Sequence, residues 1–145
     1  MFHKALVATG GSPWSHHAVE TAIHLAVHLK LELIMTYVLE DDPQYQPEGW
    51  DPTDPQLRAE SEATGRQVLD QAVQHAAQAQ VPHRTVAQWG GIPETIVRIA
   101  TVEHCDLIVM GTRHLTGEKR LMTGRICNAV IATAPCPVLV VPFVQ

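Results

Sequence analysis

Residues 106–141 read DLIVMGTRHLTGEKRLMTGRICNAVIATAPCPVLVV, and this stretch decides the fold. A single carboxylate, Asp106, precedes a continuous apolar run over 107–110, which is typical of a parallel strand covered on both faces. We expect Gly111-Thr112 to end this strand. A loop that leaves the carboxyl end of a parallel strand and enters a helix N-terminus is where α/β proteins bind phosphates. Any small-molecule site is therefore predicted to lie here.

The second half of this stretch predicts a helix and one more strand. Gly124 precedes a helical pattern that places Ile126, Val130 and Ile131 on one side. Pro135-Cys136-Pro137 ends the helix, because proline cannot continue a helix and restricts the residue before it. The apolar residues 138–141 then form the last strand.

The rest of the chain alternates strands and helices in the same way. The predicted strands cover residues 4–9, 31–39, 81–89, 106–110 and 138–141; the predicted helices run from Ser12 or Ser15 to about Lys30, over 56–80, from 92 onward and after 124. Five strands alternating with four helices imply right-handed crossovers and an open five-stranded parallel sheet with helices on both faces. This is the Rossmann-like or flavodoxin-like α/β class. With no repeat or second domain visible, residues 1–145 are predicted to form one domain.

Helical spacing predicts which side of each helix is buried. The expected core residues are Ala18, Ala22, Leu25, Ala26 and Leu29 in the first helix, Val68, Ala72, Val73 and Ala76 in the second, and Ile96, Val97, Ile99 and Ala100 in the third. Gly65 is expected to weaken the second helix mildly.

Residues 41–55, DDPQYQPEGWDPTDP, contain four prolines and four aspartates and have no periodicity. We interpret them as an exposed loop, since they are too long and too proline-rich for a tight turn. Two readings of Tyr45 and Trp50 stay open: they fold back over a groove or a partner, or they are solvated loop aromatics.

Composition excludes several classes of protein. The net charge is −5, and the ten Lys and Arg residues form no nucleic-acid-binding stripe. No run approaches the roughly 18 apolar residues of a membrane span. The N-terminus lacks the features of a signal peptide, so a cytoplasmic location is expected. Three cysteines without Cys-x-x-Cys spacing argue against a disulfide framework or a zinc site.

Two groups of side chains suggest other chemistry. His17, His24 and His28 share a helical stripe with Glu20, and the i, i+4 pair His24 and His28 has the spacing to chelate a metal. The other reading is a solvated face that gains charge near pH 6. Cys127 is expected in the first turn of the last helix, where the helix dipole lowers a thiol pKa. The other reading is that all three cysteines are buried thiols in a reducing compartment.

Three segments carry a resemblance to the universal stress protein family that covers essentially the whole chain. They are LVATGGS at 6–12, DLIVMGT at 106–112 and APCPVLVV at 134–141. The resemblance implies a cytoplasmic α/β domain that usually forms a homodimer, often through its last strand. Val138, Val140 and Pro142 are the interface residues expected on this basis. One branch of the family binds ATP, and another lacks the nucleotide.

The ATP-binding branch carries Gly-x-x-Gly, nine residues, then Gly-Ser or Gly-Thr. Here Gly111 and Gly124 match the first and last glycines, while His114 stands at the second glycine and Arg125 at the Ser/Thr position. Gly10 stands where the family usually has an Asp that lies near the ribose and metal. Three of the five signature positions therefore differ. The loss of a carboxylate argues against a nucleotide site that depends on magnesium.

These substitutions leave two readings open. Arg125 brings a fixed charge and five donors to a helix N-terminus, and Arg113, Lys119 and Arg120 also favour an anion. Alternatively, Arg125 and the imidazole of His114 fill the crevice themselves. If ATP or AMP binds, the expected contact residues are Thr9, Gly10, Val38, Met110, Gly111, Arg113, His114, Gly124, Arg125 and Ile126.

The leading hypothesis is a dimeric, non-catalytic binding or signalling module of the stress response. The alternative is a nucleotide-free protein that acts through protein partners. The third reading is an enzyme such as a slow ATP hydrolase. It has the least support, because no general base or set of metal ligands is evident.

Overall fold

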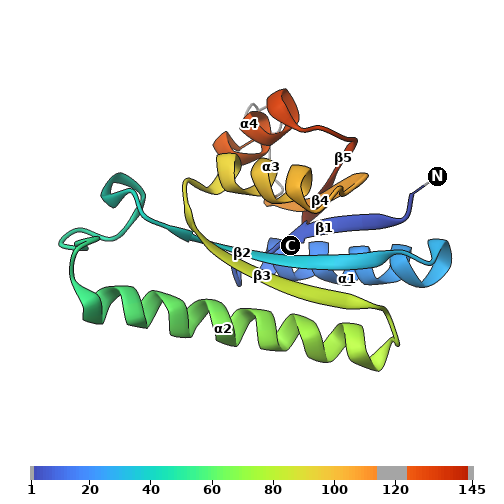
Figure 1. The fold of residues 1–145 in the computed structure, drawn as a ribbon, viewed down its shortest axis with the longest axis horizontal. Coiled ribbons are helices and arrows are strands. Elements are labelled where there is room, and N and C mark those ends of the chain that lie inside the picture. Colours follow the sequence, from blue (N-terminus) through green and yellow to red (C-terminus); the bar gives the residue numbers. More distant parts are fainter. Residues whose placement is uncertain (1, 114–123, 144–145) are drawn as a thin grey trace.

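The computed structural model describes residues 2–113 and 124–143 and contains one parallel sheet of five strands (Figure 1). The strands are β1 (Lys4–Ala8), β2 (Glu32–Glu40), β3 (His83–Gly90), β4 (Leu107–Arg113) and β5 (Val138–Phe143), in the order β3-β2-β1-β4-β5. The helices are α1 (Pro13–Leu29), α2 (Pro55–Gln78), α3 (Ile92–Val102) and α4 (Arg125–Thr133), with a short 3-10 helix η1 (Pro43–Tyr45). The predicted fold class is confirmed.

The strand order reverses beside β1. The chain adds β2 and β3 on one side of β1 and then returns to place β4 and β5 on the other, so that Ala5 pairs with both Leu33 and Leu107. In open α/β sheets the connections at such a point lie on opposite faces and leave a crevice at the carboxyl ends of the strands. The crevice between β1 and β4 is therefore where the fold positions a ligand.

Two apolar layers separate the sheet from its helices. Helices α1 and α2 cover one face, while α3 and α4 cover the other (Figure 1). Successive residues of one strand enter different layers: Val7 packs in the cluster with α1 and α2, whereas Leu6 packs in the cluster with α3 and α4. Burial on both faces is why the strands read as continuous apolar runs.

Most of the predicted helical core residues are buried, but two of them, Leu29 and Ile131, are exposed. Leu29 of α1 is 49% exposed, and Val19 and Ile23 are buried instead. In α4, Ile131 is 52% exposed and Cys127 is buried. Helix α1 contacts both the sheet and α2, so its buried face is centred between these two neighbours and not on the sheet alone. The sequence pattern of one helix does not contain that information.

Gly65 was expected only to weaken the second helix, but the structure gives it a packing role as well. It is buried, and a Cβ atom added to it would lie 2.8 Å from Cδ1 of Tyr37 on β2. The glycine therefore lets α2 approach the sheet where a large aromatic ring already fills the space.

The prediction that Gly111-Thr112 ends the fourth strand was also wrong. β4 continues to Arg113 because β5 pairs with it that far, with Gly111 opposite Val141 and Arg113 opposite Phe143. Both strands are consequently longer than predicted. Within the described ranges no helix is both long enough and apolar enough to cross a bilayer.

Candidate functional site

The connection from β1 to α1 is fixed by hydroxyl groups. Ser12 caps α1, since its Oγ accepts a hydrogen bond from the Ser15 amide at 3.2 Å, and Pro13 occupies the first turn. The Ser15 hydroxyl donates to the Ser12 carbonyl oxygen at 2.9 Å and accepts from the Gly10 amide at 3.3 Å. Gly11 takes a φ of +86°, which favours glycine. This network holds Thr9 and Gly10 at the edge of the crevice.

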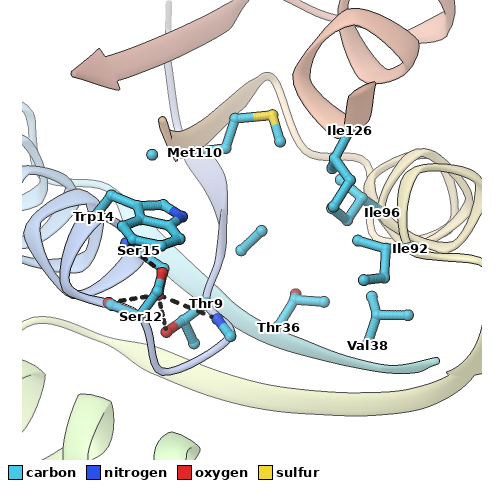
Figure 2. A pocket seen from close by; sticks show the side chains of 13 residues that line it. Thr9, Ser12, Trp14, Ser15, Thr36, Val38, Ile92, Ile96, Met110 and Ile126 are labelled. Carbon is cyan, nitrogen blue, oxygen red and sulfur yellow. Dashed lines mark hydrogen bonds between the residues drawn. The ribbon is translucent and has the colours of Figure 1, made fainter. Parts of the chain in front are cut away.

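The first hollow of the crevice has a volume of about 160 Å³ and two chemically different sides. In Figure 2, Thr9, Ser12 and Ser15 present hydroxyl groups from one side, together with Trp14. Branched apolar side chains face them from β2, α3 and α4, among them Val38, Ile92, Ile96 and Ile126. Ala8, Gly10, Thr36, Met110 and Gly111 complete the lining.

A second hollow of about 280 Å³ adjoins the first and is basic. Both hollows share Trp14, Met110, Gly111 and Ile126, so they lie side by side at the same edge of the sheet. The second is completed by Thr112, Arg113, Gly124, Arg125 and Cys127. It includes the N-terminus of α4, whose N-cap Gly124 provides no side-chain cap. A helix N-terminus without a side-chain acceptor leaves amide donors for an anion.

The fold brings together nine of the ten residues expected to contact a nucleotide. Thr9, Gly10 and Val38 line the first hollow, Arg113, Gly124 and Arg125 line the second, and Met110, Gly111 and Ile126 line both. The tenth, His114, lies outside the described residues, as do Lys119 and Arg120. That these side chains bind a ligand stays a prediction.

Sequence reasoning missed seven residues of the first hollow. They are Ala8, Ser12, Trp14, Ser15, Thr36, Ile92 and Ile96. Trp14 is the most prominent omission, because it contacts both hollows. Its position in the first turn of α1, two residues after the capping Ser12, was an available signal.

Gly111 has a structural reason to be glycine that sequence reasoning did not identify. A Cβ atom there would lie 2.2 Å from the carbonyl oxygen of Trp14, so the residue lets the first turn of α1 approach β4. A Cβ atom at Gly10 or Gly124 would meet nothing within 4 Å among the residues that the structure describes. The family glycines therefore differ in role within one crevice.

Each arginine of the second hollow lies over an aromatic ring. The Arg113 guanidinium is 5.4 Å from the centre of the Trp14 ring, and that of Arg125 is 3.8 Å from the Tyr45 ring. Both arginines are exposed, and neither forms a salt bridge with any described residue. Arg125 lines the second hollow and is not among the residues that line the first.

Tyr45 shows that the loop after β2 folds back towards the crevice, which is one of the two readings left open above. Its ring, 44% exposed, contacts Arg125 across the chain. The centres of the Trp50 ring and of the Trp89 ring on β3 lie 6.3 Å apart, and the Arg58 guanidinium lies 4.0 Å from the centre of the Trp89 ring. The two loop aromatics thus have partners on different elements.

Glu40 is another feature that the sequence did not reveal. It lies two residues beyond Val38 on β2, hence on the same face of the sheet, and is buried. Its Oε1 accepts a hydrogen bond from the Asp42 amide at 3.1 Å, whereas Oε2 has no hydrogen-bond partner among the described residues. A buried acceptor without a partner is costly and marks a position where a donor is missing.

The expectation that the helix dipole lowers the pKa of the Cys127 thiol was wrong, because the pKa is raised. Burial raises the pKa of this thiol, and a hydrogen bond with Thr112 lowers it less than burial raises it. The thiol also donates to the Gly111 carbonyl oxygen at 3.8 Å. Desolvation therefore outweighs the helix dipole, and the group is a neutral packing residue.

The histidine-rich side of α1 does not form a larger metal-binding group. The His24 and His28 rings lie edge to face with centres 4.5 Å apart, and Glu20 contacts His16, at 2.9 Å, instead of His17. Across the described ranges no three His, Cys, Asp or Glu side chains are grouped as metal ligands.

The residues expected at a dimer interface lie on β5, an outer strand of the sheet. Val138 and Val140 are partly buried and pack on the layer between the sheet and α3 and α4, whereas Pro142 is exposed. Leu139, on the opposite face of the strand, is 37% exposed.

Comparison with known proteins gives a consistent result. The model of the universal stress protein family matches residues 1–142. Universal stress protein YxiE of Bacillus subtilis is 31% identical, with 97% of this chain and 99% of that protein covered. The structure of universal stress protein UspA from Lactobacillus plantarum matches with a TM-score of 0.81 and 25% identity over 97% of each chain.

Several of the matching solved structures contain a bound nucleotide. An Arabidopsis thaliana universal stress protein family protein with AMP bound matches with a TM-score of 0.73, covering 99% of this chain and 93% of that one. At 17% identity this likeness shows a shared fold.

Proposed function

This chain belongs to the universal stress protein family, and on that premise we propose that it is a non-catalytic module that binds an adenine nucleotide in the crevice between β1 and β4. It acts in the stress response, in the cytoplasm, as a homodimer paired through β5. AMP and ATP are the candidate ligands.

The crevice supports this proposal because its parts match the parts of a nucleotide in order. Val38, Ile92 and Ile126 offer an apolar slot for a base. The hydroxyl-rich side of the same hollow suits a ribose, and the adjoining hollow suits a phosphate, since it has two arginines and the N-terminus of α4, whose N-cap Gly124 makes no side-chain cap. This adjacency of an apolar, a hydroxyl-lined and a basic region is the observation that carries the proposal.

Magnesium does not fit this chain as well as the nucleotide does. Gly10 offers no carboxylate at the position where the resemblance predicts one. Among the described residues that line the two hollows there is no Asp, Glu or His, and charge is supplied by Arg113 and Arg125. The protein side of this crevice is therefore built to meet a phosphate directly, and we assign no step to a metal.

The same lining supports a binding role over a catalytic one. A hydrolase needs a general base to activate water. The described lining residues include no Asp, Glu, His or Lys to fill that role.

The proposal is tested by extracting freshly purified protein under denaturing conditions, identifying released nucleotide by mass spectrometry, and titrating emptied protein with AMP and ATP by calorimetry. Ile92→Trp should abolish binding because the indole would fill the first hollow. Val102→Trp is the matched control, since Val102 is 67% exposed on the same helix. Absence of co-purified nucleotide together with no binding heat at millimolar AMP or ATP would contradict the proposal.

A further inference from the structure

Arg125 is the residue at which this chain departs most in chemistry from the family motif, because a long cation replaces a short hydroxyl. A flexible arginine is a costly phosphate ligand, since binding must immobilise a side chain with many rotamers. A short hydroxyl carries almost no such cost. Arg125 can therefore replace the hydroxyl as a phosphate ligand only if other residues hold its guanidinium in place.

The structure provides that support from a distant part of the chain. The Tyr45 ring lies 3.8 Å from the Arg125 guanidinium carbon, which is within the range of a strong cation–π contact. Such stacking uses the face of the guanidinium and leaves its in-plane N–H donors available for a planar or tetrahedral anion. Arg125 makes no salt bridge with the described residues that would occupy those donors.

The support is itself anchored at both ends of η1. The Asp42 carboxylate caps η1 by accepting from the Gln44 amide at 2.9 Å, and the Gln46 side chain donates to the Glu40 carbonyl oxygen at 2.8 Å. Further along the loop, Trp50 packs near Trp89. Tyr45 is therefore presented by a short structured turn and not by a free loop.

The other arginine of the second hollow has an analogous arrangement. Arg113 lies over the Trp14 ring, but at 5.4 Å. Trp14 comes from α1 and Tyr45 from the β2–α2 loop, so two independent elements place an aromatic face behind a cation of the same hollow. The shorter distance identifies Arg125 as the more tightly held of the two.

From this geometry we infer that Tyr45 is a positioning residue: it holds the Arg125 guanidinium so that its edge meets the phosphate of a nucleotide in the crevice. The inference rests on the proposed nucleotide-binding function. The loop between β2 and α2, residues 41–54, thereby gains a role in phosphate recognition. This role explains how an arginine can stand at the Ser/Thr position of the motif.

The test compares Tyr45→Ala with Tyr45→Phe, using calorimetric titration of the emptied full-length protein with AMP and, separately, with adenosine. Tyr45→Ala should weaken AMP binding about two- to fivefold, the range of a cation–π contact at an exposed site, and leave adenosine binding unchanged. Tyr45→Phe keeps the ring and should bind AMP within about twofold of the unaltered protein, because the stacking needs the ring and not the hydroxyl. In an Arg125→Ala background, Tyr45→Ala should have no further effect.

The outcomes separate the inference from the function on which it rests. If the unaltered protein binds neither AMP nor adenosine, both the proposed function and the inference are wrong. If it binds AMP and Tyr45→Ala binds equally well, the function stands and the inference is wrong. Equal loss of AMP and adenosine affinity in Tyr45→Ala would also overturn it, because the ring would then act on the nucleoside or on the fold.

Discussion

Gly111 connects the stability of this protein to the shape of its crevice. The residue lies in β4, lines both hollows, and has the Trp14 carbonyl oxygen where a side chain would begin. Because the obstacle is the backbone of α1, it cannot rotate away as a side chain could. The close approach of α1 to β4 in turn places Trp14 between the two hollows.

We expect Gly111→Ala to destabilise the protein by about 1–3 kcal/mol, the usual cost of overpacking a closed site. Urea unfolding followed by circular dichroism measures the change. Gly10→Ala is the control: a Cβ atom there meets nothing within 4 Å, so its free energy of unfolding should change by less than about 0.5 kcal/mol. Equal stability of both variants would show that β4 and α1 separate easily at this point.

Gly10 offers a second prediction at the scale of one residue. Its open surroundings and its φ outside the left-handed region mean that an aspartate fits there without strain. Gly10→Asp should therefore fold normally and should make ATP affinity depend on magnesium, by about fivefold or more between buffers with magnesium and with EDTA. The unaltered protein should show little difference between the two buffers. Magnesium dependence in the unaltered protein, absent from the variant, would contradict this view of the site.

Among the secondary-structure elements, α2 shows most clearly how packing can override intrinsic preference. Its central Gly65 is an unfavourable residue in a helix, by about 1 kcal/mol relative to alanine. Yet the residue is buried directly against the Tyr37 ring of β2. Tyr37 is itself partly buried, and burial raises the pKa of its hydroxyl group.

Gly65→Ala should lower the free energy of unfolding by about 1 kcal/mol, since an overpacking cost of about 1–3 kcal/mol exceeds the gain in helix propensity. Ala63→Gly, at an exposed position of the same helix, measures the propensity term alone and should cost about 1 kcal/mol. Stabilisation of Gly65→Ala by the full propensity difference would mean that α2 shifts away from Tyr37 at no cost.

At the scale of the whole molecule, the sheet has two outer strands, β3 and β5. An outer strand presents unpaired backbone groups, which proteins cover, shorten or pair with another chain. Leu139 on β5 adds an exposed apolar side chain to that edge. The Val140 side chain, by contrast, packs inside the protein, so a charge there would disturb the core as well as an interface.

If β5 pairs with its counterpart in a homodimer, Leu139→Arg should convert the protein to a monomer with unchanged circular dichroism. Light scattering coupled to size-exclusion chromatography measures the mass. Val102→Arg, a change at an exposed apolar residue of α3, should leave the mass unchanged. A dimer that persists in Leu139→Arg would place the interface elsewhere.

The sequence by itself determined the fold class and the alternation of strands and helices along the chain, and it predicted the region of the candidate site. Apolar runs such as 107–110 specify strands buried on both faces, and the alternation with helices leaves an open parallel sheet. Because ligand crevices of such sheets lie at the carboxyl ends of the strands, the loop from Gly111 to Gly124 could be assigned to a candidate site from its position, whereas Thr9 was added through the family resemblance.

Only the tertiary structure decided which side chains complete that site and what each glycine is for. Tyr45 and Arg125 are eighty positions apart by number, and no local pattern predicts that their side chains stack. Likewise, the Trp14 carbonyl oxygen opposite Gly111 and the Tyr37 ring opposite Gly65 belong to other elements. Local periodicity reports which face of an element is apolar, whereas the identity of the atoms that meet that face depends on how whole elements pack.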